Sequence, residues 1–524
     1  MIHKIKTYTI DGLIGHEITI EIGTSKSLPT IEVIGLPDAM IRESKERIRS
    51  ALRNSGMDLP ARKFILNLSP SDIRKSGTSF DLPMSVGLIR SIIHDSATNV
   101  DLLHNSLFFG EVGLDGQVKR IDGLLPMVIA AKKTGYRDFF VPEDNLYELE
   151  YIEGIRLYPI RHCTQLIDYF VHNKTPYCIH EHKIIDILNT TYQREVDMAH
   201  IKGQYFAKRA LTVAASGLHN IMMIGPPGSG KTMLAKGLHS ILPPLNHAEI
   251  LEVSQIYSVV GKLDKDMPLV IHRPLRSIHH TASRISIVGG GSNLRPGEVS
   301  LAHRGVLFMD ELTEFPRETL EVLRQPIEDK AITISRVTGS VNYPASFMFV
   351  SAMNPCKCGH YKDPYKQCIC SFQEIKRYQS KISGPLLDRI DMIMEIPREN
   401  INTILDQEDT THHETSDILR AKVIESRTIQ QRRYEGTGIH CNAQLSAKHI
   451  QQYIKLEPEA EQFLKNQSAK MMLSTRVIHR LMKLGRSIAD MDKSTTIGLH
   501  HIAEAFQYRN KGLIAESEGI GVGT

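Results

Sequence analysis

The chain has 524 residues, of which 41% are hydrophobic and 23% charged, and its formal net charge is +4. This composition is typical of a soluble globular protein, and the length indicates about two to four domains. No apolar stretch reaches the roughly 18 residues that a membrane-spanning helix needs, and the N-terminus has no apolar signal core. We therefore expect no membrane partner. The seven cysteines, an odd number, favour a reducing cytoplasm over a disulfide framework.

Residues 1–170 alternate strand-like runs with stretches of helical periodicity, which predicts a mixed α/β domain. Strands are predicted over 17–22, 30–34 and 63–68, and helices over 39–55 and 124–134. The polar, histidine-rich stretch 171–197 has weaker periodicity and is predicted to be a linker.

A short run in this first domain, 75–83, resembles the active-site turn of Lon-type proteases, with Ser79 in the place of the nucleophile. The run 110–125 also follows the Lon pattern. A serine–lysine dyad needs a desolvated lysine to deprotonate the serine, but the corresponding position here is Leu125. The resemblance implies a Lon-like α+β domain over 1–170 that is not proteolytic and that serves assembly or DNA engagement.

Residues 225–232 read Gly-Pro-Pro-Gly-Ser-Gly-Lys-Thr, a complete phosphate-binding loop. The apolar run 221–224 before it predicts a buried parallel strand, and the residues from Met233 onward predict a helix. Lys231 would bind the β- and γ-phosphates of ATP, and the Thr232 hydroxyl would bind Mg²⁺. The expected nucleotide-binding positions are Gly225, Pro226, Pro227, Gly228, Ser229, Gly230, Lys231 and Thr232.

Two further apolar runs end in polar residues that suit ATP hydrolysis. The run 306–309 ends in Asp310 and Glu311. Asp310 would share Mg²⁺ with the loop threonine, and Glu311 would orient the attacking water. The second run ends at Asn354, whose amide either helps to position this water or only caps a loop.

Two arginines complete the candidate catalytic set. Arg389 follows an apolar run and has acidic residues on both sides, so it forms either a surface ion pair or an arginine finger for a neighbouring subunit. Arg476 begins a predicted helix and could reach the phosphates from a lid. Strands and helices alternate over 198–398, the range 399–512 reads as a helical bundle, and the tail 513–524 is predicted to be disordered.

The order of these elements resembles that of an AAA+ ATPase: phosphate loop, Asp-Glu strand, Asn strand, arginine, and a helical lid with a second arginine. The closer resemblance is to the magnesium-chelatase-like branch, and within it to the ComM (YifB) family, over nearly the whole chain. It is carried by the runs 197–204, 273–281, 288–303, 323–329, 354–359 and 382–391.

The resemblance implies a ring, expected to be a hexamer, that hydrolyses ATP with Mg²⁺ and acts on single-stranded or branched DNA. ComM is associated with branch migration in natural transformation. Its catalytic residues would be Glu311, Asn354, Arg389 and Arg476. Two rival functions are a chelatase-like remodeller of a protein or cofactor and a nucleotide-gated scaffold. The N-terminal domain, which the chelatase subunit is expected to lack, argues against chelatase activity.

Two segments are candidates for contact with nucleic acid. By resemblance, 332–344 is a hairpin, with its bend at 338–339, that lines the pore of a ring. The stretch 271–296 resembles an insert in the second core helix and is rich in arginine. Basic loops that face a channel suit phosphate binding, and the alternative is that both segments are solvated surface loops. The arginines concerned are Arg273, Arg276, Arg284 and Arg295.

Four of the seven cysteines lie close together, at Cys356, Cys358, Cys368 and Cys370. Two close pairs of thiols match a tetrahedral zinc site, although the C-x-C spacing is tighter than usual. The sequence thus predicts either a structural Zn²⁺ or reduced thiols without a metal. His360 would be a substitute ligand.

Overall fold

The computed structural model of the chain divides into two compact units. The first comprises 1–189, 246–270 and 337–342, and the second comprises 190–245, 271–336 and 343–524. The structure describes residues 2–93, 103, 105–172, 174, 176–183, 194–291, 294–336, 339–399 and 414–509. The predicted tail 513–524, the first half of the hairpin bend at 338–339 and part of the predicted linker 171–197 lie outside these residues.

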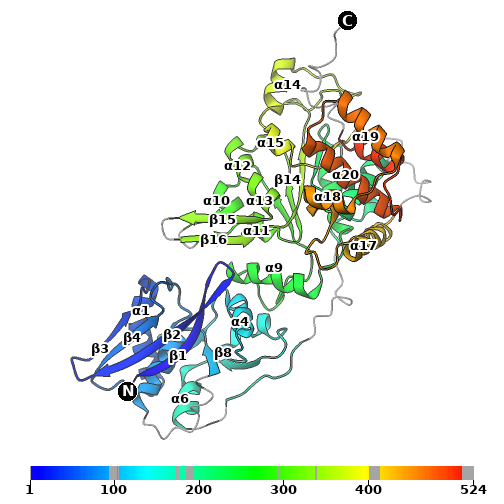
Figure 1. Cartoon of the computed structure of the whole chain (residues 1–524). Coiled ribbons are helices and arrows are strands. Elements are labelled where there is room, and N and C mark those ends of the chain that lie inside the picture. The colour runs from blue at the N-terminus through cyan, green and yellow to red at the C-terminus, as the bar shows by residue number, and fades with distance from the viewer. Residues whose placement is uncertain are drawn as a thin grey trace. The chain divides into compact units, whose positions relative to one another are not determined.

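The first unit is built on a seven-stranded sheet with the order β3-β4-β2-β1-β5-β8-β9 (Figure 1). β1 and β2 pair antiparallel, as do β2 and β4, whereas the other neighbouring strands pair in parallel. The strands are β1 (His3–Asp11), β2 (Ile14–Ser25), β3 (Thr30–Ile34), β4 (Lys63–Ser69), β5 (Ser106–Phe108), β8 (Asp138–Pro142) and β9 (Arg156–Ile160), and a separate two-stranded sheet pairs β6 (Glu111–Val112) with β7 (Val118–Lys119).

Helices cover both faces of this sheet. A Cβ at Gly87 of α2 would meet Ile22 and Ile5, whereas a Cβ at Gly15 of β2 would meet Ala130 of α4 and Tyr8. Ile5 and Tyr8 are three residues apart on β1 and therefore point to opposite faces. The helices of this unit are α1 (Ala39–Asn54), α2 (Asp81–Ile92), α4 (Leu124–Lys133), α5 (Leu146–Leu149), α6 (Cys163–Val171) and α9 (His247–Val259). The strands and helices predicted in 1–170 are thus present as β2, β3, β4, α1 and α4.

Helix α9 comes from the range predicted as the nucleotide-binding core, 198–398, but it belongs to the first unit. Ser258 Oγ donates a hydrogen bond of 2.7 Å to the buried carboxyl of Glu148, and the Gly123 N–H donates to the Ser258 carbonyl. The segment 246–270 therefore lies within the predicted core range in sequence but packs with the N-terminal domain.

The second unit contains a five-stranded parallel sheet with the order β11-β14-β17-β10-β18. Four of these strands are almost continuous apolar runs, because a parallel sheet with helices on both faces has no solvated side. The strands are β10 (Ile221–Ile224), β11 (Leu275–Ile278), β14 (Val306–Met309), β17 (Met348–Met353) and β18 (Met392–Glu395). Around it lie α7 (Tyr205–Gly217), α8 (Lys231–Ser240), α10 (Arg284–Val288), α11 (Glu298–Leu301), α12 (Arg317–Val322), α13 (Arg324–Asp329), α14 (Phe372–Gln379) and α15 (Gly384–Leu387).

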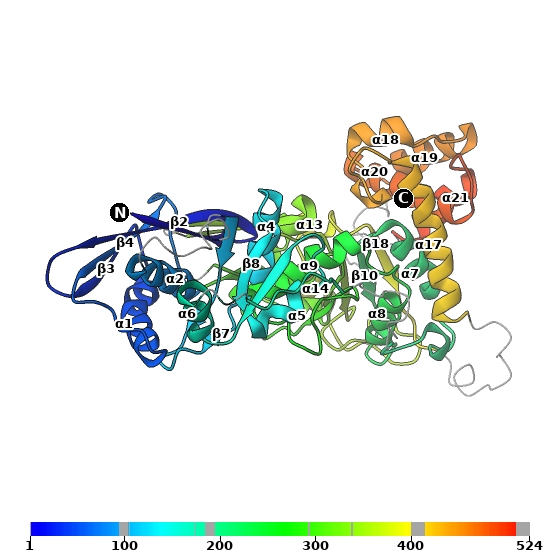
Figure 2. The same cartoon turned by 90° about the horizontal axis from the view of Figure 1, so that it is seen from below.

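The C-terminal part of the second unit is helical, as predicted (Figure 2). Its helices are α17 (Ser416–Arg433), α18 (Ala447–Tyr453), α19 (Pro458–Lys470), α20 (Thr475–Met491) and α21 (Leu499–Gln507). Apolar residues of α17, α20 and α21 join those of α7 and α8 in one continuous core. Within the described residues, no helix combines the length and apolar character needed to cross a bilayer.

Candidate active site

The phosphate loop joins β10 to α8, which begins at Lys231. Gly228 and Gly230 have φ angles of +80° and +86°, which residues with a side chain rarely adopt, and this permits the tight turn of a phosphate-binding loop. A Cβ at Gly225 would lie 2.2 Å from the carbonyl oxygen of Ile396. Backbone geometry therefore explains why glycine occupies these three positions.

The amine of Lys231 is buried and held by three oxygens. It donates hydrogen bonds to the carbonyls of Gly225 (2.8 Å) and Pro226 (2.9 Å) and to Oδ1 of Asn354 (3.3 Å). Burial lowers the pKa of Lys231 to about 8, and the carboxylates beside it oppose this decrease. The fold therefore brings Lys231 and Asn354, which follow two neighbouring parallel strands, to one edge of the sheet.

The acidic pair after β14 lies at the same edge. Thr232 Oγ1 donates a hydrogen bond of 2.7 Å to Oδ2 of Asp310, so the two groups predicted to share Mg²⁺ are already adjacent. Hydroxyl and carboxylate oxygens are ligands that Mg²⁺ prefers, and these residues therefore fit the ion. Glu311 has a φ of +50°, and its side chain is 54% exposed, which leaves the carboxylate accessible to water.

His280 is a neighbour of this site to which the sequence assigned no role. Its Nδ1 lies 3.5 Å from the Glu311 carboxylate. It follows β11, which pairs in parallel with β14, so both strand ends meet at one edge. The available signal was the adjacent pair His279-His280, whose two rings lie 4.2 Å apart.

Arg389 and Arg476 meet at a single carboxylate on α13. Arg389 Nη2 forms an ion pair with Oε2 of Glu328, and Arg476 Nη2 donates a hydrogen bond of 2.9 Å to Oε1. Arg389 also donates to the Pro385 carbonyl at 2.8 Å. In the described part of the chain, neither arginine contacts the phosphate loop. Arg476 thus lies with the predicted arginine finger rather than at the phosphate loop of its own subunit.

These arginines line a cavity of about 810 Å³ between the core and the helical region. Its lining includes Lys330, Arg389, Arg476, Arg480 and Lys483, against Glu328 and Asp391. Burial alone would raise the pKa of Asp391, but Arg480, at 2.9 Å, holds it well below its usual range. The basic side chains of the lining outnumber the acidic ones, and this excess of positive charge suits an anionic group such as a phosphate.

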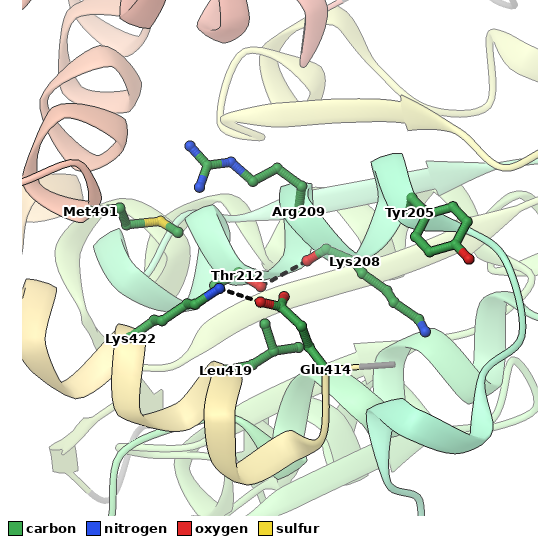
Figure 3. Close-up of a pocket in the computed structure, with 8 residues that line it drawn as sticks. All are labelled: Tyr205, Lys208, Arg209, Thr212, Glu414, Leu419, Lys422 and Met491. Atoms are coloured by element: carbon green, nitrogen blue, oxygen red, sulfur yellow. Dashed lines mark hydrogen bonds and ion pairs between the residues drawn. The ribbon is translucent and has the colours of Figure 1, made fainter. Parts of the chain in front are cut away.

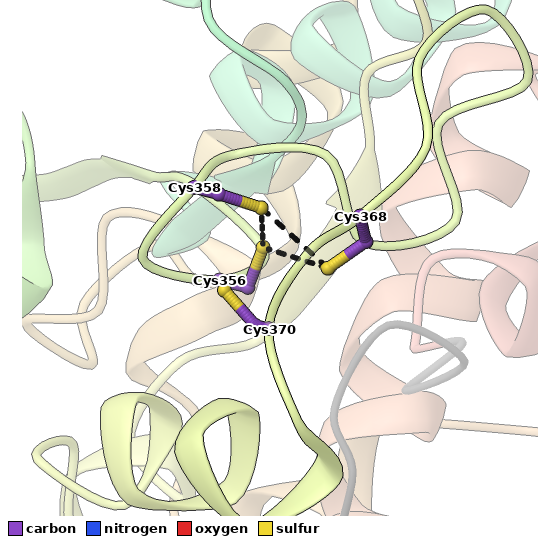
Figure 4. A group of neighbouring side chains, drawn as sticks. All are labelled: Cys356, Cys358, Cys368 and Cys370. Carbon is purple, nitrogen blue, oxygen red and sulfur yellow. Dashed lines mark hydrogen bonds between the residues drawn. The ribbon is translucent and has the colours of Figure 1, made fainter.

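The four cysteines that follow Asn354 converge (Figure 4). Their sulfur atoms lie within 4.8 Å of one another, and three of the separations are 3.3, 3.5 and 3.7 Å. A tetrahedron of thiolates about 2.3 Å from zinc has edges of about 3.8 Å, so the cluster fits the ion. His360 is not one of the grouped residues, and its Nδ1 is hydrogen-bonded to Asp363 at 3.0 Å.

Hydrogen bonds lower the pKa of one of these thiols, Cys358. Burial alone would raise the pKa of Cys358, but the backbone N–H groups of His360 and Ile369, together with neighbouring thiols, lower it to about 6. Because metal ligands must be deprotonated, a thiolate at Cys358 favours metal binding.

A smaller cavity of about 120 Å³ lies where α7 meets α17 and α20 (Figure 3). Lys422 pairs with Glu414 across it, and the Thr212 hydroxyl donates to the Lys208 carbonyl. The volume suits a few water molecules rather than a nucleotide. This cavity is therefore part of the junction between core and lid.

In the Lon-like turn of the first unit, the candidate nucleophile position is buried. Ser79 is 7% exposed, and Leu125, at the position of the protease lysine, is completely buried. Lys75, four residues before the serine, donates its amine to the carbonyl of Pro70. The absence of proteolytic activity in this domain remains a prediction.

The arginines predicted to face nucleic acid divide into two groups. Arg273 donates to the carbonyls of Pro243 and Arg304, and Arg276 forms an ion pair with Glu298, so both serve internal contacts. Arg284 and Arg295 have exposed positions, on α10 and on β13 (Arg295–Pro296), which pairs with β12 (Gly289–Gly290). A second hairpin is formed by β15 (Ala331–Arg336) and β16 (Gly339–Pro344).

Comparisons with known proteins agree with this geometry. A family model described as magnesium chelatase, subunit ChlI, matches residues 197–404, and its C-terminal counterpart matches 413–509. A third model, subunit ChlI of Mg-chelatase, matches 20–145. The N-terminal domain therefore does not by itself separate the chain from chelatase subunits, contrary to the argument from sequence.

Full-length relatives identify the family more closely. YifB of Escherichia coli is 37% identical over 492 residues, which are 94% of each chain. The competence protein ComM of Haemophilus influenzae is 36% identical over 492 residues, with the same coverage. Lon protease 2 of Bacillus subtilis is 28% identical over 131 residues, 25% of this chain and 23% of the protease. The chain therefore belongs to the YifB and ComM family of magnesium-chelatase-like AAA+ ATPases.

Proposed function

We propose that this ATPase is a cytoplasmic motor that assembles as a ring, a hexamer, and moves DNA, as a branch-migration helicase does. The observation that carries the proposal is the separation of two half-sites. Lys231, Thr232 and Asp310 meet at one edge of the parallel sheet, whereas Arg389 and Arg476 meet on Glu328. Each half-site becomes complete when a second copy supplies the other half.

The residues at the sheet edge divide the work of hydrolysis. Thr232 and Asp310 would hold Mg²⁺, which neutralises charge on the phosphates when it is bound. Lys231 would exchange its bonds to the loop carbonyls for bonds to the β- and γ-phosphates. Glu311 would accept a hydrogen bond from the attacking water, and the Asn354 amide would hold the same water in line with the γ-phosphate.

Two observations support DNA as the substrate. The full-length relative from Haemophilus influenzae is named a competence protein. Arg284 on α10 adds positive charge at an exposed position beside the β12–β13 pair. Because such contacts are made to phosphates, binding should not depend on sequence and should weaken as salt increases.

The rival proposal is a chelatase-like remodeller, which the family models favour by their descriptions. ATP hydrolysis with and without DNA distinguishes the two. We expect single-stranded or four-way-junction DNA to raise the rate about tenfold, within the range of coupling between sites, and this stimulation to fall steeply between 50 and 200 mM salt. A rate that is unchanged by single-stranded, duplex and junction DNA would exclude the motor and favour the remodeller.

We also propose that the four cysteines bind a structural Zn²⁺. The close approach of their sulfur atoms supports this proposal. Protein purified without chelator is expected to contain one zinc per chain by elemental analysis, and the double variant Cys368→Ser/Cys370→Ser should contain none. A wild-type zinc content far below one per chain would favour reduced thiols without a metal.

A further inference from the structure

The loop that carries the four cysteines packs directly on the phosphate loop. Gly359, one residue after the second cysteine, has a φ of +84°. A Cβ at this position would lie 2.7 Å from Cδ of Pro227, the third residue of the phosphate loop. This contact requires glycine both for its backbone conformation and for the close approach. The Gly359 N–H donates to the Cys356 carbonyl at 3.0 Å, so the contact lies within the turn that presents the first two thiols.

The same loop reaches the site at two more points. Cys356 is separated only by Pro355 from Asn354, which accepts a hydrogen bond from Lys231. The Pro355 carbonyl in turn accepts a hydrogen bond of 2.7 Å from the buried Gln379 on α14. A cavity of about 440 Å³ is lined by Gly225 and Pro226 of the phosphate loop and by Pro355, Tyr361 and Asp363 of the cysteine loop. The two loops therefore form one packed assembly.

The thiols are placed to hold this assembly together. Cys356 and Cys358 lie on the arm that contacts the phosphate loop, and Cys368 and Cys370 lie on the returning arm that enters α14. A metal that binds all four joins the two arms and removes the conformational freedom that the contacting arm would otherwise have.

We propose that the metal at the four cysteines stabilises the conformation of the phosphate loop. Loss of the metal therefore weakens nucleotide binding, although the metal does not contact the nucleotide. This inference rests on the zinc site proposed above. The coupling is mechanical: the metal holds the turn of Gly359 against Pro227 and thereby holds the loop that surrounds the phosphates. A metal ion that is bound only by thiolates thus controls the affinity of the protein for a nucleotide that the metal does not contact.

The test measures the binding of a fluorescent ATP analogue with Mg²⁺ to the full-length protein, together with zinc content. One variant alters the metal site, and a second alters the contact between Gly359 and the phosphate loop. Cys368→Ser/Cys370→Ser removes the metal but leaves the Gly359 contact, and Gly359→Ala disturbs the contact but keeps all four thiols. We expect each to raise the Kd of the analogue about tenfold, and Gly359→Ala to retain one zinc per chain.

Gly436→Ala is the matched control. Gly436 has a φ of +75°, so alanine introduces similar backbone strain, but a Cβ there meets no atom within 4 Å. We expect this control to bind both zinc and the analogue as the wild type does. A wild-type Kd in Gly359→Ala, or in a zinc-free double cysteine variant with native circular dichroism, would overturn the coupling. Wild-type protein without zinc would instead refute the zinc site, while the Gly359→Ala measurement would still report on the contact between the loops.

Discussion

Replacing Glu311 with glutamine is expected to lower the rate of ATP hydrolysis by about 10²- to 10⁴-fold while ATP binding persists. Glutamine preserves the size of the side chain but loses the negative charge that orients and polarises the attacking water. The Lys231 amine and the Thr232–Asp310 pair, which would hold the phosphates and Mg²⁺, remain in place. Steady-state phosphate release and equilibrium binding of a nucleotide analogue measure the two properties separately.

Glu318→Gln is a suitable control for this variant. Glu318 is an exposed carboxylate in the first turn of α12, on the same segment of the chain. Its neutralisation should leave both hydrolysis and binding unchanged, because it lies outside the set of residues that meet at the sheet edge. Normal hydrolysis by Glu311→Gln would show that another group orients the water, and the adjacent His280 would then be the first residue to examine.

Replacing Arg389 with alanine is expected to lower hydrolysis by about 10³- to 10⁵-fold, the range typical of arginine fingers, with nucleotide binding retained. The guanidinium is held on Glu328 together with that of Arg476. We expect Arg476→Ala to reduce hydrolysis in the same way. Arg377→Ala, on the exposed face of α14, is the control and should hydrolyse ATP at the wild-type rate.

A mixing experiment decides whether Arg389 acts on its own subunit or on a neighbour. Arg389→Ala keeps an intact phosphate site, and Lys231→Ala keeps an intact arginine but binds ATP poorly. Each variant alone should be nearly inactive. In mixed rings, the arginine of a Lys231→Ala subunit can serve the site of an adjoining Arg389→Ala subunit, so activity should return to a measurable fraction of the wild-type rate. A mixture that stays as inactive as its components would place Arg389 in its own subunit's site.

The nucleotide half-site is the part of the function that local sequence specifies best. A strand, a glycine-rich loop and a helix are consecutive in the chain, and the roles of Lys231 and Thr232 follow from their positions in that unit. Asp310, Glu311 and Asn354 could be added because parallel strands end at a common edge, wherever they occur in the chain. The helical character of the C-terminal region likewise follows from periodicity within each helix.

The sequence by itself therefore predicted the fold of the core and the residues that we propose to hold the phosphates of ATP. Tertiary structure alone decided which distant groups meet. It placed Arg389 and Arg476 on one carboxylate, directed Arg273 and Arg276 to internal partners, and set Gly359 against the phosphate loop. The physical reason is that periodicity and turn chemistry act over a few residues, whereas these contacts join segments whose approach depends on how complete layers pack.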